Sequence, residues 1–286
     1  LAISLISGLL FVFWERRQEK AHKNVILYLG LFSITSFRNG SIAAAIISMG
    51  EFGILFALPL WLQNVLGLSP VSSGLVLLWL ALGAFLASGV GGALSGKLPP
   101  ARAVQIGVML ELIAVIGIAL LASTASGWVL VATLLLVYGI GIGLATAQLT
   151  GVIMIDVPMD QNGQASGSQS TVRQVGSALG IAVLGTMLFT GIQSNLETNL
   201  QDTGLTAAQQ AQVVEIVVDS AGGAIPVLDQ ILLPQQVSQQ VLDDVIYQSG
   251  EAFTEGVKLA AWAAGLFLFL GFLSTFRLGR KAKVKA

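Results

Sequence analysis

Two glutamates stand inside stretches of the sequence that are otherwise apolar. Glu51 lies near the middle of residues 41–64, and Glu111 lies near the middle of residues 102–123. A charged side chain at the centre of a bilayer costs about 2.5–3.5 kcal/mol on insertion scales. Because hydrocarbon favours the neutral acid, each glutamate could take up a proton from one side of a membrane and release it to the other. We interpret them as candidates for proton coupling or for binding a substrate cation. The alternative is a protonated glutamate that only bonds a neighbouring helix, worth about 0.6 kcal/mol.

Long apolar segments position these glutamates. Each is long enough to cross about 30 Å of hydrocarbon as a helix, which takes about 20 residues. Their continuous apolarity argues against a transmembrane barrel, whose strands alternate. We therefore predict an all-α membrane protein with a six-helix bundle, preceded by residues 1–14 as the end of a truncated transmembrane helix. The predicted spans are 41–64, 71–95, 102–123, 128–150 and 171–193, which make five helices within 41–193, and a last helix over 256–276.

The composition excludes several classes of protein. Only 10% of the residues are charged and 55% are hydrophobic, whereas soluble domains carry about 25% charge. The chain has no cysteine, which excludes disulfides, thiolate metal sites and cysteine nucleophiles. Its single histidine, His22, lies in a charged stretch away from the apolar segments. We expect no enzyme, no metal or other cofactor and no nucleic acid partner; the lipid bilayer is the expected surrounding.

The positions of the cations predict the orientation. If six spans alternate across the membrane, thirteen of the fourteen Lys and Arg residues fall on one side, and Lys258 is the exception. Lys and Arg are retained in cytoplasmic loops. We therefore predict a multi-pass protein of the plasma (cytoplasmic) membrane, with residues 15–40 as a cytoplasmic loop that contains an interfacial helix. The basic tail 277–286 is predicted to be cytoplasmic.

Residues 194–255 form the one long segment on the other side. They contain no Lys or Arg but nine acidic residues. Valines follow helical spacing in two places, with Gly and Pro residues between them. We expect an acidic extracytoplasmic loop that folds as a helical hairpin. It is either a solvated cap on the bundle or a vestibule or gate that attracts cations.

The segment Gly91 to Leu98 has the glycines and lysine of a phosphate loop, but a membrane helix precedes it where a strand is needed, and prolines follow. It resembles instead the cytoplasmic loop signature of the major facilitator superfamily, Gly-x-Leu-x-Asp-Arg-x-Gly-x-Arg. Here the family's Asp is replaced by Gly96 and its second Gly by Pro99. The positions that correspond to the signature are Gly92, Leu94, Lys97 and Arg102.

Two further stretches resemble the fourteen-helix drug:proton antiporters of the EmrB/QacA type. Residues 58–75 are similar to an outer hairpin of that family, and residues 164–186 are similar to the entry into its thirteenth helix. The resemblance implies that residues 1–14 end the eighth helix and that 41–276 are helices nine to fourteen. The chain would then be the C-terminal half of a transporter whose N-terminal domain is its missing partner.

The resemblance also implies a function, which is proton-coupled multidrug efflux by alternating access, with protons and small hydrophobic or cationic molecules as ligands. Two alternatives stay open. One is a proton-coupled solute importer of the same fold, and the other is a truncated membrane fragment that transports nothing alone.

Further residues are candidates for motion between states. Asp156 and Arg173 bracket the loop 156–170 and either mark the membrane interface or form an ion pair that acts as an inner gate. Gly176, Gly180 and Gly185 lie on similar faces of one predicted helix, which favours close helix packing and sliding. Possible cavity groups are Gln148, Gln174, Trp61, Trp79 and Phe85.

Overall fold

The computed structural model describes residues 2–21, 25, 28–94, 98–233 and 237–278, and within them all regular structure is helical. Six helices are long and apolar enough to cross a membrane. The prediction of an all-helical membrane bundle is therefore confirmed. These helices are α2 (Thr35–Asn64), α3 (Pro70–Leu94), α4 (Pro100–Leu121), α5 (Trp128–Met154), α6 (Asn162–Asn199) and α9 (Gln239–Thr275).

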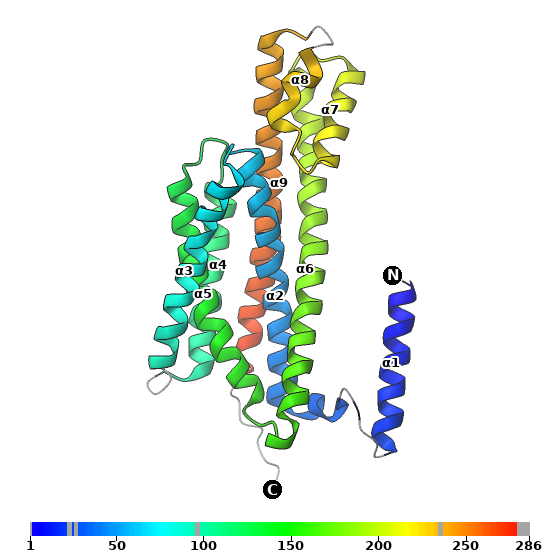
Figure 1. Cartoon of the computed structure of the whole chain (residues 1–286), viewed down its shortest axis with the longest axis vertical. Helices are drawn as coiled ribbons and strands as arrows, with labels where there is room; N and C mark the ends of the chain where they lie inside the picture. Colours follow the sequence, from blue (N-terminus) through cyan, green and yellow to red (C-terminus); the bar gives the residue numbers. More distant parts are fainter. Residues whose placement is uncertain (1, 22–24, 26–27, 95–97, 234–236, 279–286) are drawn as a thin grey trace.

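Helix α2 lies at the centre of the bundle. It contacts α5, α6 and α9, and it is the most buried of the six spans. Helices α3 and α4 pack on α5, and α4 also packs on α9. Figure 1 shows α3, α4 and α5 on one side of α2 and α6 on the other. Side chains of α2 therefore meet residues of α5, α6 and α9, which is where a central site can form.

Helix α1 (Ala2–Lys20) stands apart from the bundle in Figure 1 and carries exposed apolar side chains such as Leu9 and Phe13. It runs six residues beyond the predicted end at residue 14. The reason is that Glu, Arg, Gln and Lys are strong helix formers, so charge ends the span without ending the helix.

The interfacial helix expected within residues 15–40 stays a prediction. Residues up to 20 belong to α1, Leu29–Ser33 form a short 3₁₀ helix, and α2 already begins at Thr35. The apolar residues of this stretch thus pack beneath the bundle, where Leu31 and Phe37 are fully buried.

Four spans extend beyond their predicted bounds. Helix α2 begins at Thr35, α5 ends at Met154 and α6 begins at Asn162. Helix α6 also continues to Asn199, and α9 begins at Gln239 rather than at residue 256. Ser238 caps the start of α9, because its hydroxyl accepts from the Val241 N–H. The second amphipathic segment of the expected hairpin is therefore the first part of the last span, continuous with it.

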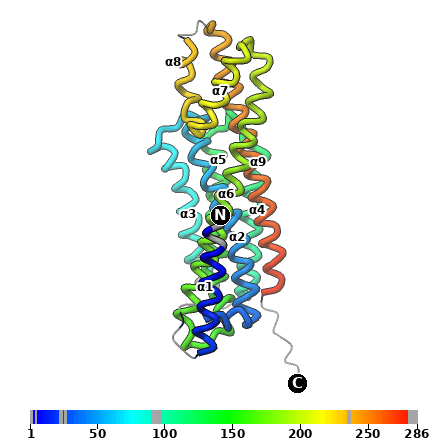
Figure 2. Tube along the Cα trace, turned by 90° about the vertical axis from the view of Figure 1, so that its right-hand side faces the viewer, coloured from blue at the N-terminus to red at the C-terminus, as the bar shows by residue number. Residues whose placement is uncertain are grey.

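Between the end of α6 and the start of α9 lie α7 (Ala207–Asp219) and α8 (Leu228–Leu232). Figures 1 and 2 place them at the end of the bundle where α9 begins. A capping box between Thr206 and Gln209 starts α7. Val213 and Val217 of α7 are buried. This small helical layer is called the α7–α8 cap below.

Glycines bring α6 against α2. A Cβ on Gly176 would lie 2.5 Å from the Ala45 carbonyl oxygen, and one on Gly180 would meet the backbone of Met49. Only glycine fits such close backbone approach. At Gly185 the nearest atom is in the Phe56 ring, 3.5 Å away, so this third glycine leaves ordinary space.

Candidate functional site

An ion pair joins α6 to α2 at the centre of the bundle. The Arg173 Nη2 lies 3.6 Å from the Glu51 Oε2, and the Arg173 Nε donates to the Ser48 hydroxyl at 3.4 Å. Glu51 is buried, whereas 29% of the Arg173 side chain is exposed. The contact follows from the glycines at 176 and 180, since they let α6 lie close enough to α2 for a side chain one turn away to reach Glu51.

Glu111 lies in α4 on the other side of this pair. It is fully buried, and neither carboxyl oxygen has a hydrogen-bond partner among the described residues. Its Cγ packs against α5, where a Cβ on Gly141 would lie 2.7 Å away. Three residues before Gly141, Tyr138 of the same helix contacts the Glu51 backbone. Glu51, Arg173 and Glu111 are therefore grouped as the acid–arginine cluster below.

Tyr138 of α5 completes the surroundings of this cluster. It is buried, and its hydroxyl donates to the Glu51 backbone carbonyl at 3.3 Å. Tyr138 was not among the residues predicted from the sequence, because its burial and its contact with Glu51 are seen only in the structure.

A polar pocket of about 350 Å³ opens beside Arg173. Serines and glutamines of α6 supply most of its wall, and Arg173 is the only charged residue in its lining. The Gln169 Nε2 donates to the Thr150 hydroxyl at 3.1 Å, which ties α6 to α5 at the pocket edge. Polar side chains in membrane helices face a bundle interior or a water-filled path. The lining residues are Phe52, Thr150, Ser166, Gln169, Ser170, Arg173, Gln174 and Ser177.

The inner-gate pair expected between Asp156 and Arg173 is not formed in this state. Asp156 is exposed in the turn after α5. Arg173 lies about three turns into α6, on the face toward α2, and its ion pair within the described residues is with Glu51. The sequence placed both residues near one loop but could not say which way the arginine points.

The predicted loop signature is only partly described. Gly92 and Leu94 lie in the last turn of α3, Arg102 is exposed in the first turn of α4, and Lys97 lies outside the described residues. Close by, the Gln148 Nε2 donates to the Gly91 carbonyl at 3.2 Å. Gln148 therefore holds α5 to α3.

Of the aromatic cavity candidates, one is buried in a contact between helices and two are exposed. Trp61 is buried and its Nε1 donates to the Thr254 hydroxyl at 3.0 Å, which is a helix-packing contact between α2 and α9. Trp79 and Phe85 are exposed on α3. Gln174 is the one candidate of this set in the polar pocket. Among the described residues, no three His, Asp or Glu side chains are grouped as a metal site would require.

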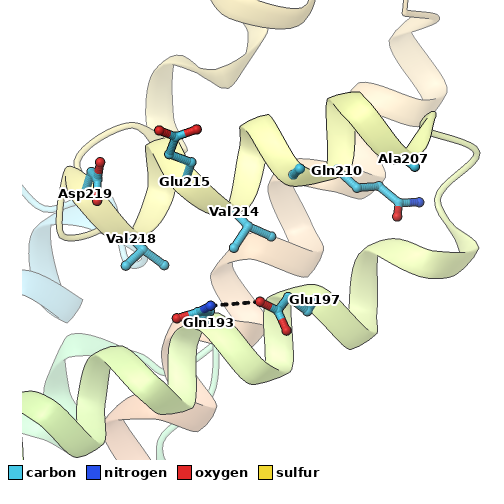
Figure 3. Close-up of a pocket in the computed structure, with 9 residues that line it drawn as sticks. Gln193, Glu197, Ala207, Gln210, Val214, Glu215, Val218 and Asp219 are labelled. Carbon is cyan, nitrogen blue, oxygen red and sulfur yellow. Dashed lines mark hydrogen bonds between the residues drawn. The ribbon is translucent and has the colours of Figure 1, made fainter.

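A second hollow lies between the C-terminal part of α6 and α7 (Figure 3). It has a volume of about 520 Å³, with Val214 and Val218 on its α7 wall. Glu197 accepts from the Gln193 Nε2 at 2.9 Å across its α6 side. Glu215 and Asp219 line it from α7, and no basic residue does. The segment expected as either a cap or a cation vestibule thus has a packed layer and an acidic groove.

Comparison with known proteins gives the family. Residues 1–181 match the model of the Major Facilitator Superfamily. The chain is 28% identical over 274 residues to the multidrug resistance protein Stp of Mycobacterium tuberculosis, which covers 94% of this chain and 48% of Stp. It is 28% identical over 267 residues to the multidrug efflux pump LfrA of Mycolicibacterium smegmatis, covering 93% of this chain and 49% of LfrA.

A tetracycline resistance determinant of Streptomyces rimosus is 30% identical over 280 residues, with 92% of this chain and 76% of that protein covered. The chain spans about half the length of Stp and LfrA. The resemblance to drug efflux transporters seen in the sequence motifs is confirmed. Together with the six membrane helices, these matches place the chain in the Major Facilitator Superfamily of membrane transporters, and not among enzymes.

Proposed function

We propose that this chain is the C-terminal half of a proton-driven drug exporter that works by alternating access. The observation that carries the proposal is the acid–arginine cluster, in which Glu51 of α2 pairs with Arg173 of α6 and Glu111 of α4 is a second carboxyl buried in the same bundle. The relatives named as multidrug efflux or resistance proteins support export as the direction. The chain spans about half of their length, which is what the C-terminal half of such a transporter would cover.

The cluster provides a way to couple a proton to movement. Protonation of Glu51 removes the negative charge that attracts Arg173 across the contact between α2 and α6. The α2–α6 contact is then weakened where the two helices are closest. One proton moving down 100 mV supplies about 2.3 kcal/mol, so export needs no ATP. Glu111, which has no hydrogen-bond partner among the described residues, is the second site for a proton.

The substrates proposed are small hydrophobic or cationic molecules. The relatives include a tetracycline resistance determinant and a tetracenomycin C resistance and export protein. Such molecules leave the membrane through a site that faces first one side and then the other.

The proposed orientation puts the α7–α8 cap outside the cell and the C-terminus in the cytoplasm. Arg38, Arg102 and Arg277 lie at helix ends opposite the α7–α8 cap (Figure 1), as the preference of cations for the cytoplasmic side requires. Lys258, at the middle of α9, donates to Glu255 at 2.7 Å and so has an acidic partner.

The experiment is proton-coupled efflux by the transporter formed when this chain is joined to its N-terminal half. In everted vesicles, addition of drug should release protons in the wild type and not in Glu51→Gln, while Thr198→Ala on an exposed part of α6 serves as the control. Unchanged coupling in Glu51→Gln would remove that residue from the mechanism. The 286-residue chain alone is expected to transport nothing.

A further inference from the structure

The polar pocket beside Arg173 is rich in hydrogen-bond donors and contains no carboxylate. Its wall consists of serine and threonine hydroxyls, two glutamine amides, one guanidinium and the ring of Phe52. A cation entering it meets the positive charge of Arg173, because Glu51 lies behind that side chain and is buried. The pocket therefore differs chemically from the acidic groove under α7.

Three side chains of the wall are exposed on a helix that crosses the membrane. Ser166, Ser170 and Gln174 repeat every four residues along one face of α6. Hydroxyls and amides turned toward lipid would lose hydrogen bonds to water, so such a face belongs against a water-filled path. The stripe makes the pocket a place where a solute can lie.

Arg173 has unused donors on this side. A guanidinium carries five N–H groups. Within the described residues its contacts are the 3.4 Å bond from Nε to Ser48 and the 3.6 Å pair between Nη2 and Glu51. Since 29% of the side chain is exposed, an acceptor in the pocket can bind Arg173 while the pair with Glu51 stays in place.

We propose that this pocket binds uncharged aromatic molecules rich in carbonyl or ether oxygens, with an oxygen on the Arg173 guanidinium and a ring against Phe52. The inference rests on the proposed transport function and narrows its substrate class. The volume of about 350 Å³ suits a small fused-ring molecule.

Arg173 then links this ligand to the proton. While Glu51 is charged, it holds the guanidinium at the pocket floor; once Glu51 is protonated, this anchor is lost. Ligand and proton therefore exclude each other through Arg173, which acts as a positioning residue. Ligand affinity should fall as the pH falls.

The dependence of ligand affinity on pH can be assigned to Glu51 because few other ionisable side chains lie around it in the described helices. The ionisable side chains around it are Glu111 from α4, Tyr138 from α5 and Arg173 from α6. Helix α9 packs Ala264 and Leu268 on Gly50 and has no ionisable residue between 258 and 277, and α3 has none at all.

The test measures binding to the 286-residue chain in lipid nanodiscs, without any gradient. The probe is 7-methoxycoumarin, which stays uncharged, with naphthalene as an oxygen-free comparison, tetraphenylphosphonium as a cationic one and empty nanodiscs as the blank. The coumarin should bind more tightly than either comparison, and its affinity should be lower at acidic pH than at neutral pH. Equal binding of naphthalene, or preference for the phosphonium, would overturn the proposed ligand class.

Variants test the role of Arg173. Arg173→Ala should weaken coumarin binding about tenfold or more, as expected for loss of a hydrogen bond from a charged donor. Glu51→Gln should bind as weakly as the wild type at low pH and show no pH dependence. Thr198→Ala, on the same helix outside the pocket, should change neither. Persistent pH dependence in Glu51→Gln would refute the link through Arg173.

Two further outcomes distinguish a failure of the pocket from misfolding of a variant and from failure of the proposed transport function. If Arg173→Ala does not purify as a monodisperse protein, Ser170→Ala, which leaves the ion pair intact, should still weaken coumarin binding; wild-type affinity in it would overturn the pocket. If the coumarin binds as stated but the joined transporter shows no proton-coupled efflux, the proposed function fails while the pocket stands.

Discussion

Arg173 and Glu51 are 122 positions apart in the sequence, yet the Nη2 of one lies 3.6 Å from the Oε2 of the other. Glu51 is buried, whereas the arginine is partly open to the polar pocket. The pair is therefore asymmetric: loss of the arginine leaves a buried carboxyl without its counter-charge, while loss of the carboxylate leaves a cation that water in the pocket can reach.

This asymmetry predicts unequal effects on stability. Arg173→Ala should lower the free energy of unfolding by about 3–5 kcal/mol at neutral pH, as for other broken buried pairs. Glu51→Gln should cost less, because part of the Arg173 side chain is already exposed and water can reach the guanidinium. Denaturation of the detergent-purified chain would measure both. A Glu51→Gln variant less stable than Arg173→Ala would contradict the asymmetry.

Glycine packing between α2 and α6 gives a second prediction. Gly180→Ala places a methyl group against the Met49 backbone and should destabilise the chain by about 1–3 kcal/mol. Gly185→Ala is the matched control on the same helix, since its methyl group would contact only the Phe56 ring at 3.5 Å. The midpoint of thermal unfolding should fall for the first and stay near wild type for the second. Equal shifts would show that the close contact at Gly180 does not matter.

The lack of cysteine makes the proposed orientation directly testable. Asp160 lies just before α6 and Gln201 just after it, and both are exposed. In intact cells an impermeant maleimide should label Gln201→Cys and leave Asp160→Cys unlabelled until the cells are opened. The reverse pattern would invert the topology.

The acidic groove distinguishes the vestibule from the simple cap. Exchange of Glu215→Gln together with Asp219→Asn removes two carboxylates from its lining. If the groove attracts cations, the joined transporter should bind a cationic dye from the outer side more slowly at low salt, and the difference should vanish at about 1 M salt, where the Debye length is about 3 Å. Asp243→Asn, outside the groove on exposed α9, is the control. Unchanged rates of dye binding at low salt would rule out the cation vestibule and favour the simple cap.

The elements that could be predicted from the sequence are those that depend on composition alone. Glu51 and Glu111 stand out because a charge inside an apolar stretch is rare. Their partner could not be found this way, because the direction of Arg173 depends on how α6 is rotated against α2. Tyr138 was missed since an aromatic residue is ordinary in such a span. The full length of α9 was missed because hydropathy marks where the membrane ends, whereas a helix ends only at a breaker or a cap.

Helix α6 runs through 38 residues from Asn162 to Asn199 and is therefore about 57 Å long. One continuous rod thus carries Arg173 in one half and a wall of the acidic groove at its far end. If α6 tilts as a rigid rod so that Arg173 moves away from Glu51, the end of α6 that lines the acidic groove beside α7 moves as well. In the proposed transporter, an antibody fragment that fixes α6 to α7 would then stop the transport cycle without contacting the polar pocket. A fluorescent label at the α7 end of α6 would report the same movement.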